Sequence, residues 1–386
     1  MVQSREEAIK EYFHSGFSYE EICCLLQSRH GFTFSLRQLH RILRKNNLFK
    51  RKNKSPLNSV MDFVSKELQG SCSGFGYRMM HQKLRKDGYV TDRETTRLIL
   101  KALDPEGVTL RLNRRLRRRV YHSAGPNFVW HIDGYDKLKP YGISVHGAVD
   151  GYSRKILWLV ADSTNKDPKV VASYFVNSLR DLNLVPRKIR ADRGSENVVI
   201  GGIQRFLRRS HNDSASEMQS FSYGKSTNNQ RIEAWWSFFR RSRTNWWINF
   251  FKDLEETTDF DQSVYHHFEC VRFCFLTIIQ TELDETKKMW NSHRIRYVRN
   301  SECPGGRPDV LFFAPHHSGG RDCKFPLLQS ELQLAKECCT ESRMFGCSTE
   351  FVQLARIIMQ ENQLVMPMNV VEAKELFETL IDEIDS

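Results

Sequence analysis

Three acidic residues occur where carboxylates could do metal chemistry. Asp133 directly follows the apolar run 128–132, and Asp192 directly follows the run 188–191. Glu233 lies at the start of a segment with helical spacing. Both runs are typical of strands, so each aspartate is predicted one step beyond a strand end, where side chains converge in an α/β sheet. Oxygen ligands favour Mg²⁺ or Mn²⁺ over Zn²⁺. Two such ions can promote in-line displacement at phosphorus, so the pattern predicts phosphoryl transfer.

The elements that must position these carboxylates begin after the Gly-Pro break at 125–126. Apolar runs predict strands over 128–132, 142–149, 155–160 and 188–191. Helical spacing predicts helices over 168–182 and 203–209. The order of three strands, a helix, a strand and a helix favours a mixed α/β sheet flanked by helices.

Four strings in this region carry a resemblance to a known family. They are Trp-His-Ile-Asp at 130–133, Val-Asp-Gly-Tyr-Ser-Arg at 149–154, Asp-Arg-Gly-Ser-Glu-Asn at 192–197 and Asn-Asn-Gln-Arg-Ile-Glu at 228–233. Their order resembles the DDE integrase core of retroviral integrases and many transposases. Fifty-eight residues separate Asp133 from Asp192, and forty separate Asp192 from Glu233. The second spacing exceeds the family's usual one, which predicts an insertion around 211–222.

The resemblance covers residues 126–310, because Trp290 to Arg294 and Gly306 to Pro308 are similar to the post-core segment of insertion-sequence transposases. It implies an RNase H-like fold in which Asp133, Asp192 and Glu233 bind two Mg²⁺ or Mn²⁺ ions. It also implies DNA (element ends and target DNA) as the partner and a homo-oligomer as the working form. Glu196 is expected to support the site without binding metal, and Gly194 to let the chain turn.

A single aspartate at a strand end is more often a turn cap than a ligand. Asp150 is read in that way, with Arg154 as its expected partner. The three carboxylates in matching contexts and order outweigh this simpler interpretation for Asp133 and Asp192.

The charge distribution places a polyanion partner at the front of the chain. Residues 1–125 hold 25 Lys and Arg against 12 Asp and Glu, and the chain as a whole carries +12. Within 1–50, three short helices with tight turns predict a helix-turn-helix unit. Its last helix carries the expected DNA contacts Arg37, Arg41, Arg44 and Lys45. A generic three-helix bundle would have the same periodicity.

Residues 51–124 predict a second unit of this kind, with helices over 57–68, 77–84 and 92–103 that end at 104–107. An arginine-rich linker follows. Its candidate DNA contacts are Arg114, Arg115, Arg117, Arg118 and Arg119. Such a run could neutralise several phosphates or act as a localisation signal. Further phosphate contacts are expected around the third carboxylate, at Lys225, Arg231 and Arg240.

The rest of the chain is predicted to be helical. Residues 125–310 are taken as the catalytic core with its post-core segment and 311–386 as an acidic helical region. Eight aromatic residues between Trp235 and Phe251 favour core packing and a dimer surface over base stacking. His316 and His317 are assigned no zinc, and no other cofactor site is predicted.

These observations exclude several function classes. No run of 18 apolar residues occurs, the start of the chain is charged, and the ten cysteines form no CxxC pair, so a membrane-spanning or disulfide-rich secreted protein is not expected. The sequence predicts a nuclear DDE polynucleotidyl transferase. The alternatives are a domesticated, catalytically silent DNA-binding protein and a plain nuclease.

Overall fold

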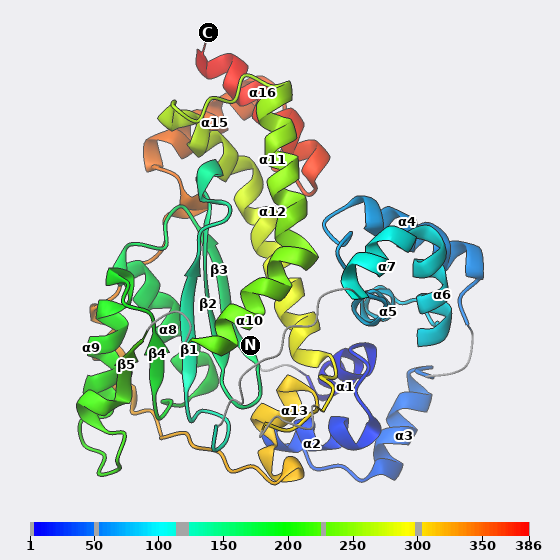
Figure 1. The fold of residues 1–386 in the computed structure, drawn as a ribbon, viewed down its shortest axis with the longest axis vertical. Helices are drawn as coiled ribbons and strands as arrows, with labels where there is room; N and C mark the ends of the chain where they lie inside the picture. Colours follow the sequence, from blue (N-terminus) through cyan, green and yellow to red (C-terminus); the bar gives the residue numbers. More distant parts are fainter. Residues whose placement is uncertain (1–3, 50–53, 113–122, 225–228, 298–302, 386) are drawn as a thin grey trace.

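A five-stranded mixed sheet with the order β3-β2-β1-β4-β5 forms the centre of the protein in this computed structural model, which describes residues 4–49, 54–112, 123–224, 229–297 and 303–385. Strands β1 (Trp130–Tyr135), β2 (Ser144–Asp150) and β3 (Ile156–Asp162) are antiparallel. Strands β4 (Ile189–Ala191) and β5 (Phe221–Tyr223) continue the sheet, parallel to β1 (Figure 1). The predicted mixed α/β sheet with an RNase H-like arrangement is confirmed.

The two faces of the sheet are covered by different helices. Trp130 and Ile132 of β1 pack in one core with α8 (Pro168–Leu182), α9 (Val198–Leu207) and α14 (Gln329–Glu337). Tyr135 packs in the other core with α10 (Gln230–Phe239), α11 (Asn245–Thr257) and α12 (Tyr265–Ser292). Because side chains alternate along a strand, Asp133 shares the face of Tyr135 and looks toward α10.

Two sequence predictions about the sheet need correction. Asp133 lies inside β1 and pairs with Gly147 of β2, so this strand continues two residues beyond the carboxylate. The predicted insertion at 211–222 contains the start of β5, a strand too short for its pattern to be recognised. Asp192 does follow β4 directly, as expected.

The first N-terminal unit has the predicted three helices, α1 (Arg5–His14), α2 (Tyr19–His30) and α3 (Leu36–Lys45). Ser18 and Ser35 begin α2 and α3 with capping boxes that satisfy free backbone N–H groups. Gly31 ends α2 in the left-handed conformation, with φ 71°.

The second unit is longer than predicted. Helices α4 (Leu57–Gln69), α5 (Tyr77–Lys86) and α6 (Arg93–Leu103) match the expected positions. The predicted end at 104–107 is wrong, because α7 (Pro105–Leu112) begins there. Proline fits the first turn of a helix, and the Asp104 carboxylate accepts a hydrogen bond from Gly107 N–H at 2.9 Å.

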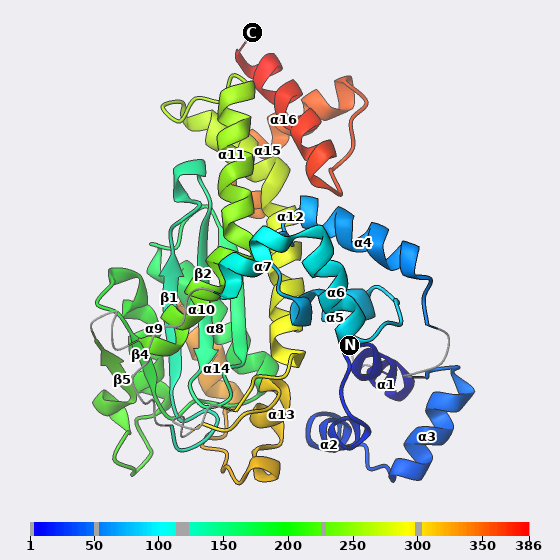
Figure 2. The same cartoon turned by 45° about the vertical axis from the view of Figure 1, so that its right-hand side comes forward.

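Both units attach to the core through α12 and the helix that follows it. Figures 1 and 2 show the second unit on the side of α12 that faces away from the sheet. Ser71 and Lys86 bind Glu282 and Glu285 of α12, each at 2.7 Å. The first unit packs through α2 on α13 (Pro308–Phe313).

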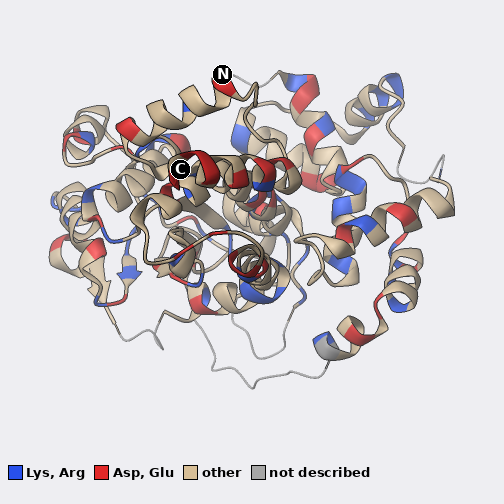
Figure 3. Ribbon diagram, turned by 90° about the horizontal axis from the view of Figure 1, so that it is seen from above, with Lys and Arg blue, Asp and Glu red and all other residues tan. Residues whose placement is uncertain are grey.

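The C-terminal region is helical, as predicted. Helices α15 (Thr349–Glu361) and α16 (Val370–Asp385) pack on α12 in the core that contains α10 and α11. Figure 3 shows the acidic residues of α16 next to the C-terminus. Within the described ranges, no helix combines the length and the apolar character that a bilayer crossing requires.

Candidate active site

Asp133 is held by an indole from the helix that covers its face of the sheet. Trp236 Nε1 of α10 donates a hydrogen bond to Asp133 Oδ2 at 3.0 Å. The Trp236 ring stacks on Tyr135, with a centroid distance of 4.8 Å. Gly147 makes this approach possible, because a Cβ atom there would lie 2.9 Å from the indole. The contacts fix one carboxylate oxygen of Asp133.

Asp192 is oriented by the turn that follows β4. Its Oδ1 atom accepts hydrogen bonds from Gly194 N–H at 3.1 Å and from the Asn197 side-chain amide at 3.3 Å. Asn197 also donates to Glu196 Oε1 at 2.7 Å, so one buried amide connects the two acidic side chains. Gly194 has φ −69°, an ordinary value, so its backbone conformation does not require glycine, but a Cβ atom there would collide with the Glu196 carboxylate.

Glu233 lies in the first turn of α10, and a buried amide holds the start of this helix against β1. Asn229 donates to the Ile132 carbonyl at 2.8 Å, and its side-chain oxygen lies 2.7 Å from His131 Nδ1. Arg231 Nε donates to the Gly151 carbonyl at 2.9 Å. These bonds connect the helix to β1 and to the turn between β2 and β3, and they set the position of Glu233.

The three carboxylates are near enough to one another for their charges to interact. Burial, together with repulsion from Glu233 and Asp192, raises the pKa of Asp133 to about 8. Burial and the charge of Asp192 raise the pKa of Glu233. Burial also raises the pKa of Glu196, with Asp192 contributing. Carboxylates shift in this way when like charges gather in a partly desolvated site.

The donor set fits hard divalent cations. All three side chains are half-buried, so their oxygens can still be reached from solvent. Their mutual repulsion would be relieved by positive charge between them. The trio is not among the described clusters whose ligand atoms all lie within 4.8 Å of one another.

The predicted DNA contacts of the first unit share one exposed helix face. Arg37, Arg41, Arg44 and Lys45 are all exposed on α3, whereas Leu39 and Leu43 are buried in the unit's core. This is the layout of a helix that could enter a DNA groove.

The other predicted phosphate contacts differ in their exposure to solvent, and some lie outside the described residues. Arg240 is exposed at the start of the π-helix Arg240–Thr244, which joins α10 to α11. Arg231 is half-buried and binds backbone, as described above. Lys225 and the five arginines between 114 and 119 lie outside the described residues.

Some predicted contacts are replaced by others. Asp150 does cap the hairpin turn, accepting from Ser153 N–H and from Asn127 N–H, both at 2.8 Å. Arg154 does not pair with it and donates to the Pro304 carbonyl instead. The aromatic run after Glu233 packs in the core, with Trp235, Trp236 and Phe251 buried. Base stacking by these three side chains is therefore excluded.

Sequence reasoning missed the side chains that support the three carboxylates. Trp236 and Asn229 act through tertiary contacts that no local pattern predicts, whereas Asn197 acts within its own turn. Asn197 and Asn229 do fall inside the quoted motif strings. The structure also brings Cys24 beside His316 and His317, with ligand atoms within 4.8 Å. Three ligands are one fewer than the four of a structural zinc site.

Comparison with known families assigns the central part of the chain. Residues 120–306 match the family model described as Integrase core domain. No curated protein matches the sequence. This match supports assigning residues 120–306 to the DDE integrase-core superfamily, and the matched range contains all three carboxylates.

Proposed function

We propose that this integrase-core protein is a DDE-type polynucleotidyl transferase that cleaves DNA and joins a DNA 3′ end to a target strand. Membership of a polynucleotidyl transferase-type family supports the reaction class. The observation that supports the proposal is the mutual repulsion among Asp133, Asp192 and Glu233, which contributes to the raised pKa values of Asp133 and Glu233. These three residues would hold two Mg²⁺ or Mn²⁺ ions.

When bound, such ions activate the attacking water or 3′-hydroxyl and stabilise the leaving oxygen of the phosphodiester. The chain's own residues contribute positioning. Trp236 fixes one oxygen of Asp133, and Asn197 orients Asp192. Asn229 holds the start of α10 on β1 and so sets the distance of Glu233 from the sheet. No protein nucleophile is required, since phosphoryl transfer depends on positioning and charge neutralisation.

DNA would be held by the basic surfaces outside the carboxylate site. The exposed face of α3 is proposed to contact a DNA groove, and Arg240 is proposed to contact phosphate beside α10. A dimer or larger multimer is proposed because integrase-core enzymes act as multimers. Light scattering of the DNA complex tests this, and a strictly monomeric complex would contradict it.

Nuclear residence follows from the proposed substrate and is tested by imaging a tagged chain.

Replacing Asp192 by Asn tests the proposed chemistry. A branched DNA that mimics an integration product removes the need for the unknown end sequence. With Mn²⁺, wild-type protein should join strands on it, and the D192N protein should lose at least about a hundredfold in rate, since oxygen ligands to the ions are lost. DNA binding should stay within twofold.

The matched control is Asp259→Asn, at an exposed aspartate outside the site. It should join strands like the wild type. Equal activity of the D192N and wild-type proteins would refute the metal assignment. Absence of joining in the wild type, with DNA binding intact, would favour the catalytically silent alternative.

A further inference from the structure

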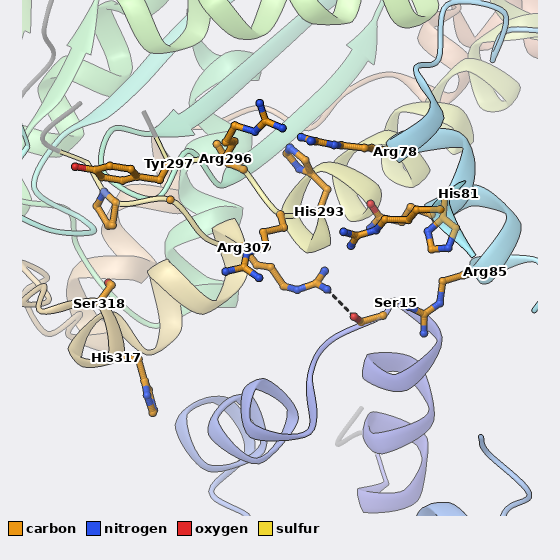
Figure 4. A pocket seen from close by; sticks show the side chains of 17 residues that line it. Ser15, Arg78, His81, Arg85, His293, Arg296, Tyr297, Arg307, His317 and Ser318 are labelled. Carbon is orange, nitrogen blue, oxygen red and sulfur yellow. Dashed lines mark hydrogen bonds between the residues drawn. The ribbon is translucent and has the colours of Figure 1, made fainter. Parts of the chain in front are cut away.

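A basic cleft lies where the two N-terminal units meet the segment after α12. It has a volume of about 600 Å³. Six arginines line it: Arg78, Arg85, Arg93, Arg294, Arg296 and Arg307. They come from α5, from α6 and from the segment between α12 and α13. In Figure 4, Arg78 and Arg296 extend their guanidinium ends toward one another from opposite sides of the cleft.

The positive charge of this cleft is not neutralised by acidic residues in its lining. No carboxylate occurs among the described residues that line it. Arg307 is paired from outside the lining set, with Glu21 at 2.9 Å. Across the described ranges, no acidic side chain forms an ion pair with Arg93, Arg294 or Arg296, and all three are exposed. Burial and the charges of Arg307 and Arg93 lower the pKa of Arg85, which is the mark of like charges held together.

The walls of the cleft are fixed by contacts that do not use these free arginines. Arg307 donates to the carbonyls of Gly16 and Ser292, and so connects the first unit to the end of α12. Arg85 reaches the Phe13 carbonyl at 3.4 Å, and Gln82 donates to Ser292. The cleft therefore lies at a packed interface between the two N-terminal units and the segment after α12. The exposed guanidinium groups at its rim have no acidic partner among the described residues.

We propose that this cleft binds the phosphodiester backbone of DNA and that bound backbone bridges the two N-terminal units and the post-core segment. This rests on the proposed function for the identity of the polyanion. Guanidinium groups match phosphate oxygens in a forked geometry. The free arginines belong to separate elements and line an open cleft, which suits an extended chain of phosphates. A free polyphosphate shares the same chemistry, so the experiment must distinguish the two sources.

The test compares two pairs of substitutions that remove the same charge. The cleft pair is Arg294→Gln with Arg296→Gln. The control pair is Arg343→Gln with Arg356→Gln, exposed arginines of the C-terminal region. Binding of the full chain to a labelled duplex of random sequence is measured by fluorescence anisotropy over a range of salt, in EDTA. Thermal unfolding checks that each variant folds, which is expected because the cleft pair is exposed.

The cleft pair should bind the duplex about tenfold more weakly at 0.1 M salt, and the slope of log K against log salt should fall by about two, one for each lost phosphate contact. The control pair should change binding less than twofold. An equal loss in both pairs, or no loss in the cleft pair, would overturn the proposal.

Inorganic tripolyphosphate is the probe for a small-anion site. Stoichiometric micromolar binding of tripolyphosphate that the cleft pair abolishes, with duplex binding unchanged, would also overturn the proposal. Because EDTA removes the metal, this binding result does not depend on chemistry. If the cleft pair weakens DNA binding but the wild type joins no strands, only the proposed transferase is refuted. If the wild type joins strands but the cleft pair binds DNA normally, only the proposed DNA cleft is refuted.

Discussion

The Asp133 carboxylate shows how single contacts turn a strand residue into a candidate ligand. One oxygen accepts the indole N–H of Trp236, which can lie that close only because Gly147 has no side chain on the neighbouring strand. In the proposed site, the other oxygen would bind a cation. A hydrogen bond that fixes a ligand in this way typically changes metal affinity or activity by 10- to 100-fold.

Trp236→Phe should therefore lower Mn²⁺-dependent strand joining by about 10- to 100-fold, with DNA binding retained. The aromatic packing on Tyr135 stays, so the change reports the lost hydrogen bond. Trp235→Phe is the matched control, because Trp235 is buried in the same helix and its Nε1 has no partner among the described residues. Equal losses in the two variants would mean that packing, not the hydrogen bond, matters.

At the scale of elements, α12 connects most parts of the molecule, and its C-terminal end is fastened to the sheet. The Asn291 side chain accepts from Ile156 N–H at 2.8 Å and donates to the Ile156 carbonyl at 2.9 Å. Trp290 Nε1 donates to the Arg154 carbonyl at 2.7 Å. The segment from Trp290 to Arg294, which resembles a post-core segment, therefore holds the end of α12 against the start of β3.

Asn291→Ala should lower the free energy of unfolding by about 2 kcal/mol, because it leaves two buried backbone groups of Ile156 without partners. Urea unfolding measures this. Asn212→Ala, at an exposed loop position, is the control and should change stability by less than about 0.5 kcal/mol. If the two variants unfold at the same urea concentration, the Asn291 contact is not holding the helix.

The sequence predicts most elements because their signals are local. Capping residues and apolar periodicity locate α2, α3 and α8, and β4 ends directly before Asp192 as expected. It misplaces the end of β1 because the polar residue Asp133 lies inside a strand whose face is covered by Trp236. The basic cleft is also invisible in the sequence, because its arginines come from positions up to about 230 residues apart.

At the scale of the whole molecule, buried histidines make stability depend on acidity. Burial lowers the pKa of His81, of His146 and of His293 to about 4 in each case. The unfolded chain, with histidine pKa values of about 6.5, takes up protons that the folded chain does not bind. Between pH 6.5 and about 4, each of these histidines therefore reduces stability as pH falls, by about 1.4 kcal/mol per pH unit.

His146→Gln tests this dependence, since Gln can still accept the hydrogen bond that Trp158 Nε1 donates at 3.0 Å. Between pH 7 and pH 5, the variant should lose about 2 kcal/mol less unfolding free energy than the wild type. Urea unfolding at both pH values gives the difference. His40→Gln, at an exposed position, should lose as much as the wild type. Identical losses in all three proteins would show that His146 is not kept neutral by the fold.

The most direct measurement is strand joining on branched DNA with Mn²⁺, comparing wild type, Glu233→Gln and Glu256→Gln. Glu233 is the carboxylate supplied by α10, whereas Glu256 is an exposed residue of α11. We expect joined product from the wild type and the E256Q protein, and at least about a hundredfold less from the E233Q protein, because the proposed chemistry requires ligation by all three carboxylates. Joining by the E233Q protein at the wild-type rate would show that Glu233 is not a ligand in this reaction.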